Sequence, residues 1–402
     1  MSLRSALSSC ALLSAGLLLS GGGLTPAAAQ QPIATVLSPV PTPFTTLTAP
    51  ANPDHFTFVI GGDNRSTGHG HPMPPSLDVI CQEIGYLHPN LVLWSGDAIE
   101  GYDDTPAEAN AEYDTFLRSA AKTGVPFFNA PGNHELGGNP AMIPIYEKRM
   151  GRLYGSFDYG NSHFIALNTD PLSADGTKID DATIDAAQMA WLEADLQANQ
   201  SAKNRFVFMH HYVFGPVDTD PKLDTGFKTT ELRDRLHALF LKYHVRAVLC
   251  GHNHRYWHTV KDGIDYYISG GAGAPLDALP TEGGYLHYVQ ITVDGTNLSS
   301  QIFQPWHLSV YYPQGETAGM ALVDNSNDFD ATAAAIPIRV PLPAAGQTLA
   351  VTATVPYKAK VKPATARVVS WKPNADGRTA EVIVSVDAPA HRGTEIRVAP
   401  GR

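Results

Sequence analysis

Five short polar segments, each directly after an apolar run, contain residue types that bind metal ions or transfer protons. They are Gly62-Asp63-Asn64-Arg65, Gly96-Asp97, Gly132-Asn133-His134-Glu135, His210-His211 and Gly251-His252-Asn253-His254. In an open α/β sheet, ligands bind beyond the carboxyl ends of the strands. If the apolar runs are strands, we therefore expect all five segments to meet at one edge of the fold.

The side chains of these segments are carboxylates, amides and imidazoles, a donor set that suits Mn, Fe or Zn. No cysteine lies among them, which disfavours a structural zinc site. Each segment alone has a simpler interpretation, because a Gly-Asp pair is usually a turn and a His-x-His pair usually lies on a surface or in a core. Five such segments in order favour a site for one or two divalent or trivalent metal ions.

The elements that would position these segments alternate between strands and helices. The patterns predict strands at 56–60, 91–94, 125–129, 205–209, 246–250 and 266–269, a hairpin over 157–167, and helices that cover 77–88 and 105–124 and begin at 185 and 230. Such alternation favours an α/β domain, which we place at 55–305. Residues 306–402 lack helical periodicity and alternate at 349–355, 366–371 and 380–386, which predicts a β-rich C-terminal domain.

The order of the five segments resembles the calcineurin-like metallophosphoesterase superfamily, whose motifs are D-x-H, G-D, G-N-H-D/E, a His after an apolar strand, and G-H-x-H. The residues that fit directly are Asp97, Asn133, His134, His210, His252 and His254. Segments 154–161, 163–165 and 188–193 are similar to its exported, purple-acid-phosphatase-like branch. The resemblance covers about 55–305 and implies a four-layer α/β fold, with two mixed β-sheets flanked by helices.

The resemblance also implies a role for each matching residue. Asp97 would bridge two metal ions, and the other ligands divide into Asn133, His210 and His252 for one ion and Asp63 and His254 for the other. His134 would protonate the leaving alkoxide or stabilise its charge; the alternative is that it orients Asp97 or a neighbouring carboxylate. His211 would lie beside the ligands and contact substrate. The implied reaction is hydrolysis of phosphate mono- or diesters by a metal-activated hydroxide.

Arg65 departs from the family's pattern, because the family usually has His at that position. Arginine stays protonated and cannot bind a metal ion. Three interpretations stay open: the ion held by Asp63 has fewer ligands and binds weakly, His69 or His71 takes the missing place, or Arg65 contacts the phosphate as a bidentate donor. We favour the first and third together, with Arg65 and His134 as catalytic and substrate-binding residues.

The N-terminal segment has the order of a secretory signal peptide. Arg4 is followed by an apolar run over 10–19 and by Ala27-Ala28-Ala29 as a cleavage site, so we place the signal at 1–29 and expect a periplasmic or extracellular protein. The run is shorter than the roughly 20 residues of a membrane-spanning helix, and no later run is long enough. Residues 30–54 are proline-rich and predict an extended arm or linker.

Composition excludes several classes of protein. Of 402 residues, 43% are hydrophobic and 17% are charged, which argues against a coiled coil or charge-rich disorder. The formal net charge of −11 does not suit a protein that binds the nucleic-acid backbone. After removal of the signal peptide, only Cys81 and Cys250 remain, and both lie in apolar patterns where we expect them to be buried.

Two classes of function follow. The first is a secreted, metal-dependent phosphoesterase that acts on a small phosphorylated substrate. The alternative is a non-catalytic metal- or ligand-binding protein on the same scaffold, whose β-rich part binds a partner, a surface or, through Tyr357 and Trp371, a carbohydrate. The retention of Asp97, Asn133 and His134 favours the enzyme. The sequence does not indicate the oligomeric state.

Overall fold

The computed structural model describes residues 47–216 and 226–305, and in the C-terminal part the segments 319–323, 333–341, 349–354, 365–373, 379–387 and 393–400. The predicted signal peptide, most of the predicted arm, and Tyr357 lie outside the described residues. Within the described ranges, no helix is both long enough and apolar enough to cross a membrane.

The larger sheet has eight strands in the order β14-β17-β12-β11-β10-β1-β2-β3. Their bounds are β1 His55–Gly61, β2 Leu91–Trp94, β3 Phe127–Asn129, β10 Tyr288–Asp294, β11 Asn297–Phe303, β12 Gly319–Val323, β14 Leu349–Thr354 and β17 Gly393–Pro400. The sheet is mixed, because β1, β2 and β3 run parallel while β10 and the strands beyond it pair antiparallel.

The second sheet has six strands in the order β4-β5-β6-β7-β9-β8. Their bounds are β4 Gly155–Tyr159, β5 Ser162–Ala166, β6 Asn204–Phe208, β7 Ala247–Cys250, β8 Tyr256–Lys261 and β9 Ile264–Ser269. This sheet is also mixed, because β5, β6, β7 and β9 are parallel while β4 and β8 form antiparallel edges. The predicted hairpin is present, with its turn at Gly160-Asn161 between β4 and β5.

The two sheets pack against each other through aromatic side chains. Successive side chains of a strand point to opposite faces, so Phe56, Phe58 and Ile60 of β1 join the core between the sheets while Val59 joins the other side. Phe58 makes edge contacts with Phe164 of β5 and with an aromatic ring of β6, at centroid distances of 5.4 and 5.2 Å. The strands of both sheets therefore share one apolar core.

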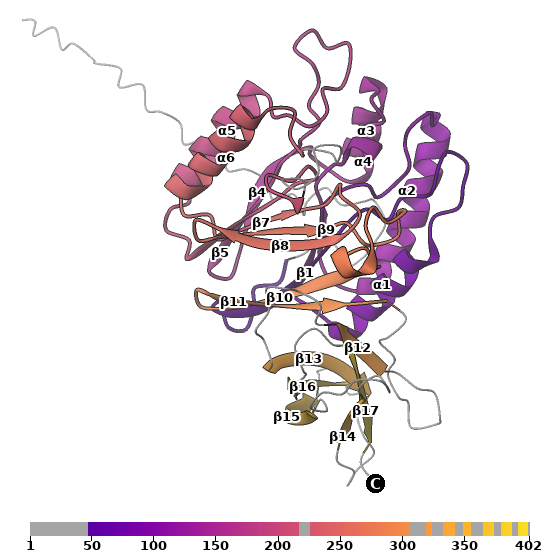
Figure 1. The fold of residues 1–402 in the computed structure, drawn as a ribbon, viewed down its shortest axis with the longest axis vertical. Helices are drawn as coiled ribbons and strands as arrows, with labels where there is room; N and C mark the ends of the chain where they lie inside the picture. The colour runs from indigo at the N-terminus through magenta and orange to yellow at the C-terminus, as the bar shows by residue number, and fades with distance from the viewer. Residues whose placement is uncertain are drawn as a thin grey trace, which may run out of the picture. The chain divides into compact units, whose positions relative to one another are not determined.

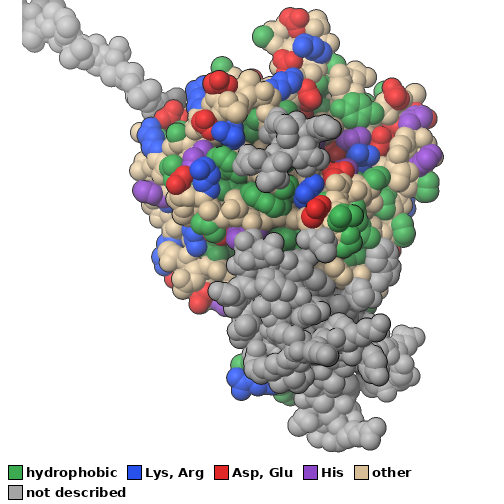
Figure 2. Space-filling view, viewed as in Figure 1, with side chains coloured by type: hydrophobic (Ala, Val, Ile, Leu, Met, Phe, Trp, Pro, Cys, Tyr) green, Lys and Arg blue, Asp and Glu red, His purple; other side chains and the backbone are tan. Residues whose placement is uncertain are grey.

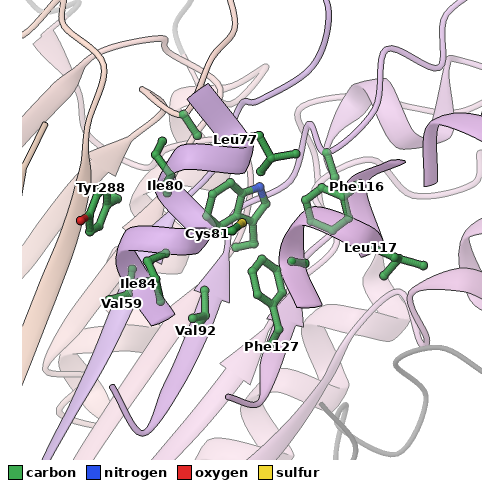
Figure 3. Close-up of a cluster of buried hydrophobic side chains, with 14 of the residues drawn as sticks. Val59, Leu77, Ile80, Cys81, Ile84, Val92, Phe116, Leu117, Phe127 and Tyr288 are labelled. Carbon is green, nitrogen blue, oxygen red and sulfur yellow. The ribbon is translucent and has the colours of Figure 1, made fainter. Parts of the chain in front are cut away.

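Helices cover the outer face of each sheet (Figure 1). The helices are α1 Pro75–Leu87, α2 Pro106–Ala120, α3 Asn133–Leu136, α4 Ile143–Arg149, α5 Ala186–Ala198 and α6 Thr230–Lys242, with short 3-10 turns at Ala121–Thr123, Pro140–Met142 and Pro280–Glu282. Figure 3 shows Ile80 and Ile84 of α1 lying over Val59 and Val92 of the larger sheet. Helices α5 and α6 share a core with the second sheet. These layers confirm the predicted fold of two mixed sheets flanked by helices.

The C-terminal strands divide between two sheets. β13 Ala333–Pro341, β16 Thr379–Asp387 and β15 Thr365–Pro373 form a three-stranded antiparallel sheet, whereas β12, β17 and β14 extend the larger sheet beyond β11. Ala380, Val382 and Val384 of β16 are buried in the same apolar cluster as residues of α1. The described segments after residue 305 are all strands, as expected, while the domain boundary at 305 stays a prediction.

Cys81 and Cys250 are both buried and form no disulfide, as expected. On the face shown in Figure 2, acidic and basic side chains are interspersed among polar and apolar ones. The acidic balance of the chain is therefore not gathered into one patch on this face.

Candidate metal centre

The five polar segments all follow strands, at the carboxyl ends of β1, β2, β3, β6 and β7. Backbone hydrogen bonds join the loops in pairs. The Asp63 amide donates to the Gly96 carbonyl, the Asn64 amide to the Asp97 carbonyl, and the Gly251 amide to the His210 carbonyl, each at 3.0 Å. The predicted meeting of the segments at one edge is therefore present.

One glycine permits this close approach. Gly96 has a φ of 93°, and a Cβ there would lie 2.5 Å from the amide nitrogen of Gly132 and 3.0 Å from Nδ1 of His210. Three non-glycine residues of the site also have left-handed backbone, with φ of 62° at Asp63, 54° at Asp97 and 67° at His252. Such strain of about 1–3 kcal/mol per residue persists only where surrounding contacts hold it.

Three hydrogen-bond acceptors lie close together in the site, namely His210 Nε2, Asn133 Oδ1 and Asp97 Oδ1. His210 Nδ1 lies 2.8 Å from the Ser95 carbonyl oxygen, which can only accept, so Nδ1 carries the proton. Burial lowers the pKa of His210 to about 3, which leaves Nε2 as an unprotonated nitrogen. This Nε2 lies 2.8 Å from Asn133 Oδ1 and 3.3 Å from Asp97 Oδ1.

The orientation of Asn133 also directs an acceptor toward this point. Its Nδ2 donates to the Tyr102 hydroxyl at 3.2 Å, so its Oδ1 faces the imidazoles. His252 Nδ1 lies 3.3 Å from that oxygen and 3.1 Å from His210 Nε2. The lone pairs of His210 Nε2 and Asn133 Oδ1 repel each other unless a proton or a cation lies beside both, and an unprotonated His252 Nδ1 would add a third ligand atom to such a cation. The residues present thus fit a metal ion held by Asn133, His210, His252 and Asp97.

A second set of ligand atoms belongs to Asp63, Asp97 and His254, which lie within 4.8 Å of one another. His254 Nδ1 donates to the Pro275 carbonyl at 2.6 Å, so Nε2 faces Asp63 Oδ1 at 3.6 Å. The Asp63 carboxylate also accepts from the backbone amide of His252 at 3.0 and 3.2 Å. The Asp97 carboxylate lies beside His210 of the first set and belongs to the second set, which is the position that the family resemblance implies for a bridging ligand.

The pKa values of the two carboxyl groups shift in opposite directions. Burial and the nearby charge of Asp97 raise the pKa of Asp63 well above its usual value. Burial also opposes ionisation of Asp97, yet the neighbouring His210, His134 and Arg65 outweigh it and lower the pKa of that carboxyl. Two carboxylates this close cannot both ionise without positive charge near them, and a bound cation supplies such charge.

His211, which the sequence analysis gave as a substrate-binding residue, lies directly beside the predicted metal ligands His210 and His252. Together with His210 and His252 it forms a group whose nitrogen atoms lie within 4.8 Å of one another. Its ring centroid is 4.0 Å from that of His252, and its Nε2 lies 3.1 Å from Asp170 Oδ1. Contact of His211 with substrate stays a prediction, and the geometry also brings a nitrogen atom of His211 within 4.8 Å of the ligand atoms of His210 and His252.

Arg65 and His134 both lie against Asp97 and Glu100. Arg65 Nε is 3.5 Å from Asp97 Oδ2, and its Nη1 is 3.1 Å from Glu100 Oε2. His134 Nδ1 donates to the Glu100 carbonyl at 2.5 Å, which leaves Nε2 3.9 Å from Asp97 Oδ2. Their predicted catalytic roles remain predictions, but both side chains lie beside the Asp97 carboxylate.

His69 and His71 take other partners. His69 Nδ1 lies 2.8 Å from Asp104 Oδ1, and His71 Nδ1 lies 2.7 Å from Thr67 Oγ1. Neither belongs to the ligand group around Asp63 in the described part of the chain. The structure therefore gives no support to the interpretation in which one of them replaces the missing ligand.

Several residues that hold the site were not singled out from the sequence. Glu135 is fully buried, and its carboxylate accepts from the backbone amides of Asp97, Ala98 and Gly132 at 2.8–2.9 Å. Asp277 accepts from the backbone amide of His254 at 2.8 Å. Glu135 belongs to one of the five polar segments, so its sequence position could have drawn attention to it. Asp277 could not be found in this way, because no local sequence pattern indicates that it contacts His254.

Comparisons with known proteins agree with this geometry. Residues 69–256 match the calcineurin-like phosphoesterase family. The chain is 30% identical to serine/threonine-protein phosphatase CPPED1 of Rattus norvegicus over 158 residues, 38% of this chain and 49% of that protein. It is 28% identical to probable inactive purple acid phosphatase 9 of Arabidopsis thaliana over 143 residues, 34% of this chain and 20% of that protein.

Among solved structures, purple acid phosphatase PPD1 from yellow lupin seeds aligns with a TM-score of 0.48 and 18% identity, over 64% of this chain and 53% of that chain. The chain spans about half or less of the length of the two curated relatives. Residues 69–256 of the chain therefore match the calcineurin-like phosphoesterase family, and the paired mixed sheets with the motif residues at their strand ends agree with that match.

Proposed function

We propose that the chain is an exported hydrolase of small phosphate mono- or diesters that requires one or two metal ions, such as Mn, Fe or Zn. The observation that carries the proposal is the convergence of three acceptors, because Asn133 Oδ1 and Asp97 Oδ1 lie 2.8 and 3.3 Å from His210 Nε2. A cation is the simplest species that stabilises such a cluster in a buried site.

When bound, the ions supply positive charge beside the phosphate and lower the pKa of the attacking water. The protein's own residues orient the ligands, since Ser95 and Pro275 fix the ring nitrogens of His210 and His254. We propose that the guanidinium of Arg65, which lies beside Asp97 and Glu100, also donates hydrogen bonds to phosphate oxygens. His134 Nε2 is the group that would give a proton to the leaving oxygen.

Export is part of the proposal. The order of Arg4, the apolar run over 10–19 and the cleavage site at 27–29 supports a signal peptide. We place the mature protein in the periplasm or outside the cell.

A second candidate function rests on Arg65. Its guanidinium lies 3.5 Å from Asp97 and 3.1 Å from Glu100, so it places a fixed positive charge where a metal would otherwise compensate these carboxylates. A protein that binds one metal ion or an anionic ligand without turnover is consistent with that arrangement. Its C-terminal strands would then contact a partner or surface.

The deciding experiment is a turnover screen of the mature protein with aryl phosphate, bis-aryl phosphate and nucleotide substrates. Each reaction contains Mn, Fe, Zn or Mg, and the bound metal is measured in parallel. We expect hydrolysis that Asp97→Asn abolishes together with metal binding. We expect His134→Ala to lower kcat about 10²- to 10⁴-fold while metal content is kept. Metal binding without turnover on any substrate would favour the second candidate, and full activity of Asp97→Asn would refute the metal centre.

A further inference from the structure

A separate group of metal-binding residue types lies outside the centre. It consists of His69 in the loop between β1 and α1, Asp104 in the loop between β2 and α2, and Glu108 in the first turn of α2. One ligand atom from each lies within 4.8 Å of the others. His69 Nδ1 is 2.8 Å from Asp104 Oδ1, and its Nε2 is 3.9 Å from Glu108 Oε1.

Asp104 provides the independent observation that points to a ligand. Its side chain is only 1% exposed, and its Oδ2 is a buried atom with no hydrogen-bond partner among the described residues. Buried carboxylate oxygens nearly always have a donor or a cation, because leaving one without a partner carries the full cost of desolvation. The imidazole of His69, whose own side chain is 44% exposed, reaches only Oδ1.

Glu108 is oriented in advance by the start of α2. Its Oε2 accepts from the backbone amide of Thr105 at 2.8 Å and from the Thr105 hydroxyl at 2.7 Å, which forms a capping box. The other oxygen, Oε1, is the one that faces His69. Helix capping therefore leaves one carboxylate oxygen of Glu108 available on the side of Asp104.

The surroundings are rich in negative charge. Asp103, Asp104 and Glu108 all act on the imidazole of His69, whose pKa is raised chiefly by its hydrogen bond to Asp104. Burial raises the pKa of Glu112 on the same helix to about 7, and the charge of Asp104 adds to that effect. In the described ranges, the ion pairs of Asp104 and Glu108 involve His69 and no lysine or arginine.

We propose that His69, Asp104 and Glu108 bind a divalent transition-metal ion at a site distinct from the catalytic centre. One imidazole nitrogen with two carboxylate oxygens suits Zn or Mn, and water completes the coordination. The site joins two loops that also carry residues of the centre, since Arg65 precedes His69 and Glu100 precedes Asp104 in their respective loops. Occupancy stabilises the start of α2 and the loop before it.

The test is a Zn titration of the metal-free full-length protein in competition with a chromogenic chelator, with the bound metal counted by mass spectrometry. His69→Ala and Asp104→Asn should each bind one equivalent less than the wild type. His71→Ala and Asp103→Asn are matched controls in the same two loops, outside the group, and should keep the wild-type number. His69→Ala also removes the imidazole that is hydrogen-bonded to the buried Asp104 carboxylate, so urea unfolding without metal is measured for each variant, and the bound Zn is counted under conditions in which the variant is folded.

Two further results decide the matter independently of the proposed function. In an Asp97→Asn background, which impairs the catalytic centre, His69→Ala should still remove one equivalent of Zn. Saturating Zn should raise the unfolding midpoint of Asp97→Asn, and the added His69→Ala change should reduce that gain. If His69→Ala binds as much Zn as the wild type, or if His71→Ala loses the same equivalent, the site does not exist as proposed.

Discussion

His163 is expected to make folding stability depend on pH in the alkaline range. The side chain is 3% exposed and lies between two carboxylates, with Nδ1 2.6 Å from Asp158 Oδ1 and Nε2 2.8 Å from Asp195 Oδ2. Asp158 is its cross-strand neighbour in the β4–β5 hairpin, and Asp195 comes from α5. Burial lowers the pKa of His163, but the hydrogen bonds to both carboxylates outweigh it and raise the pKa to about 9.

The magnitude follows from linkage. A histidine whose pKa rises from 6.5 to about 9 on folding stabilises the protein by about 3 kcal/mol, because each pH unit corresponds to about 1.4 kcal/mol. Below pH 6.5 both the folded and unfolded states carry the proton, so the full stabilisation is present. Between about pH 6.5 and 9 the unfolded state releases its proton first, and the stabilisation is lost as pH rises.

The assay is urea unfolding of metal-free wild type and His163→Gln at intervals from pH 6 to 9.5. We expect the variant to be less stable by about 3 kcal/mol at pH 6 and the gap to close by about pH 9.5. The difference between the two proteins cancels the titration of the groups that do not contact His163. His55→Gln is the control, because its imidazole lies 3.6 Å from Asp294 but both side chains are more than half exposed. A gap that stays constant over this pH range would refute the reasoning.

Three other outcomes are expected. Glu135→Gln should lower the unfolding free energy of the metal-free protein by about 2–4 kcal/mol in a urea titration, because the single side-chain oxygen of glutamine leaves at least one of the three buried backbone N–H groups without an acceptor. An unchanged unfolding free energy would mean that the Glu135 carboxylate does not stabilise these loops. Tyr102→Phe removes the hydroxyl that holds the Asn133 amide and should weaken metal binding about 10- to 100-fold by calorimetry, whereas equal affinity would assign Tyr102 to packing alone. Arg65→His should increase the number of bound metal ions measured by mass spectrometry. An unchanged number would mean that a missing ligand at position 65 does not limit metal binding at Asp63.

Local patterns were sufficient for the elements around the site. The strand at 91–94 appears as predicted, and the helix predicted from 105 starts with a capping box of Thr105 and Glu108, because apolar runs and capping residues act over a few positions. Helix α6 begins at residue 230 as expected, but its capping residue is Thr229 and not Thr230, because the Thr229 hydroxyl accepts from the Leu232 amide. Element boundaries depend on such single hydrogen bonds, which the pattern alone does not distinguish.

The hairpin of β10 and β11 was missed although its signal is present. Asp294-Gly295 is a typical hairpin turn between two alternating segments. Its importance comes from elsewhere in the chain, because β10 pairs with β1 over His55–Ile60 and so places that strand inside the larger sheet. Pairing between segments more than two hundred residues apart leaves no local trace.

For the site, residue types and order predicted which side chains meet, but not what holds them. Asp170 touches His211 across 41 positions of sequence, and a single loop aspartate has no distinguishing pattern. The departure at Arg65 was visible at once, yet its contact with Glu100 depends on how the loops after β1 and β2 meet. The meeting of these side chains was therefore predictable from residue types and order, whereas the supporting hydrogen bonds required the fold.

The left-handed backbone at Asp63, Asp97 and His252 has an evolutionary consequence. These are positions where glycine would relieve strain of about 1–3 kcal/mol each, so a chain selected for stability alone would tend to lose the residues there. Their retention would then reflect continuing selection for what the side chains do. A lineage released from that selection should drift first at these three positions, and would gain thermal tolerance as it lost the site.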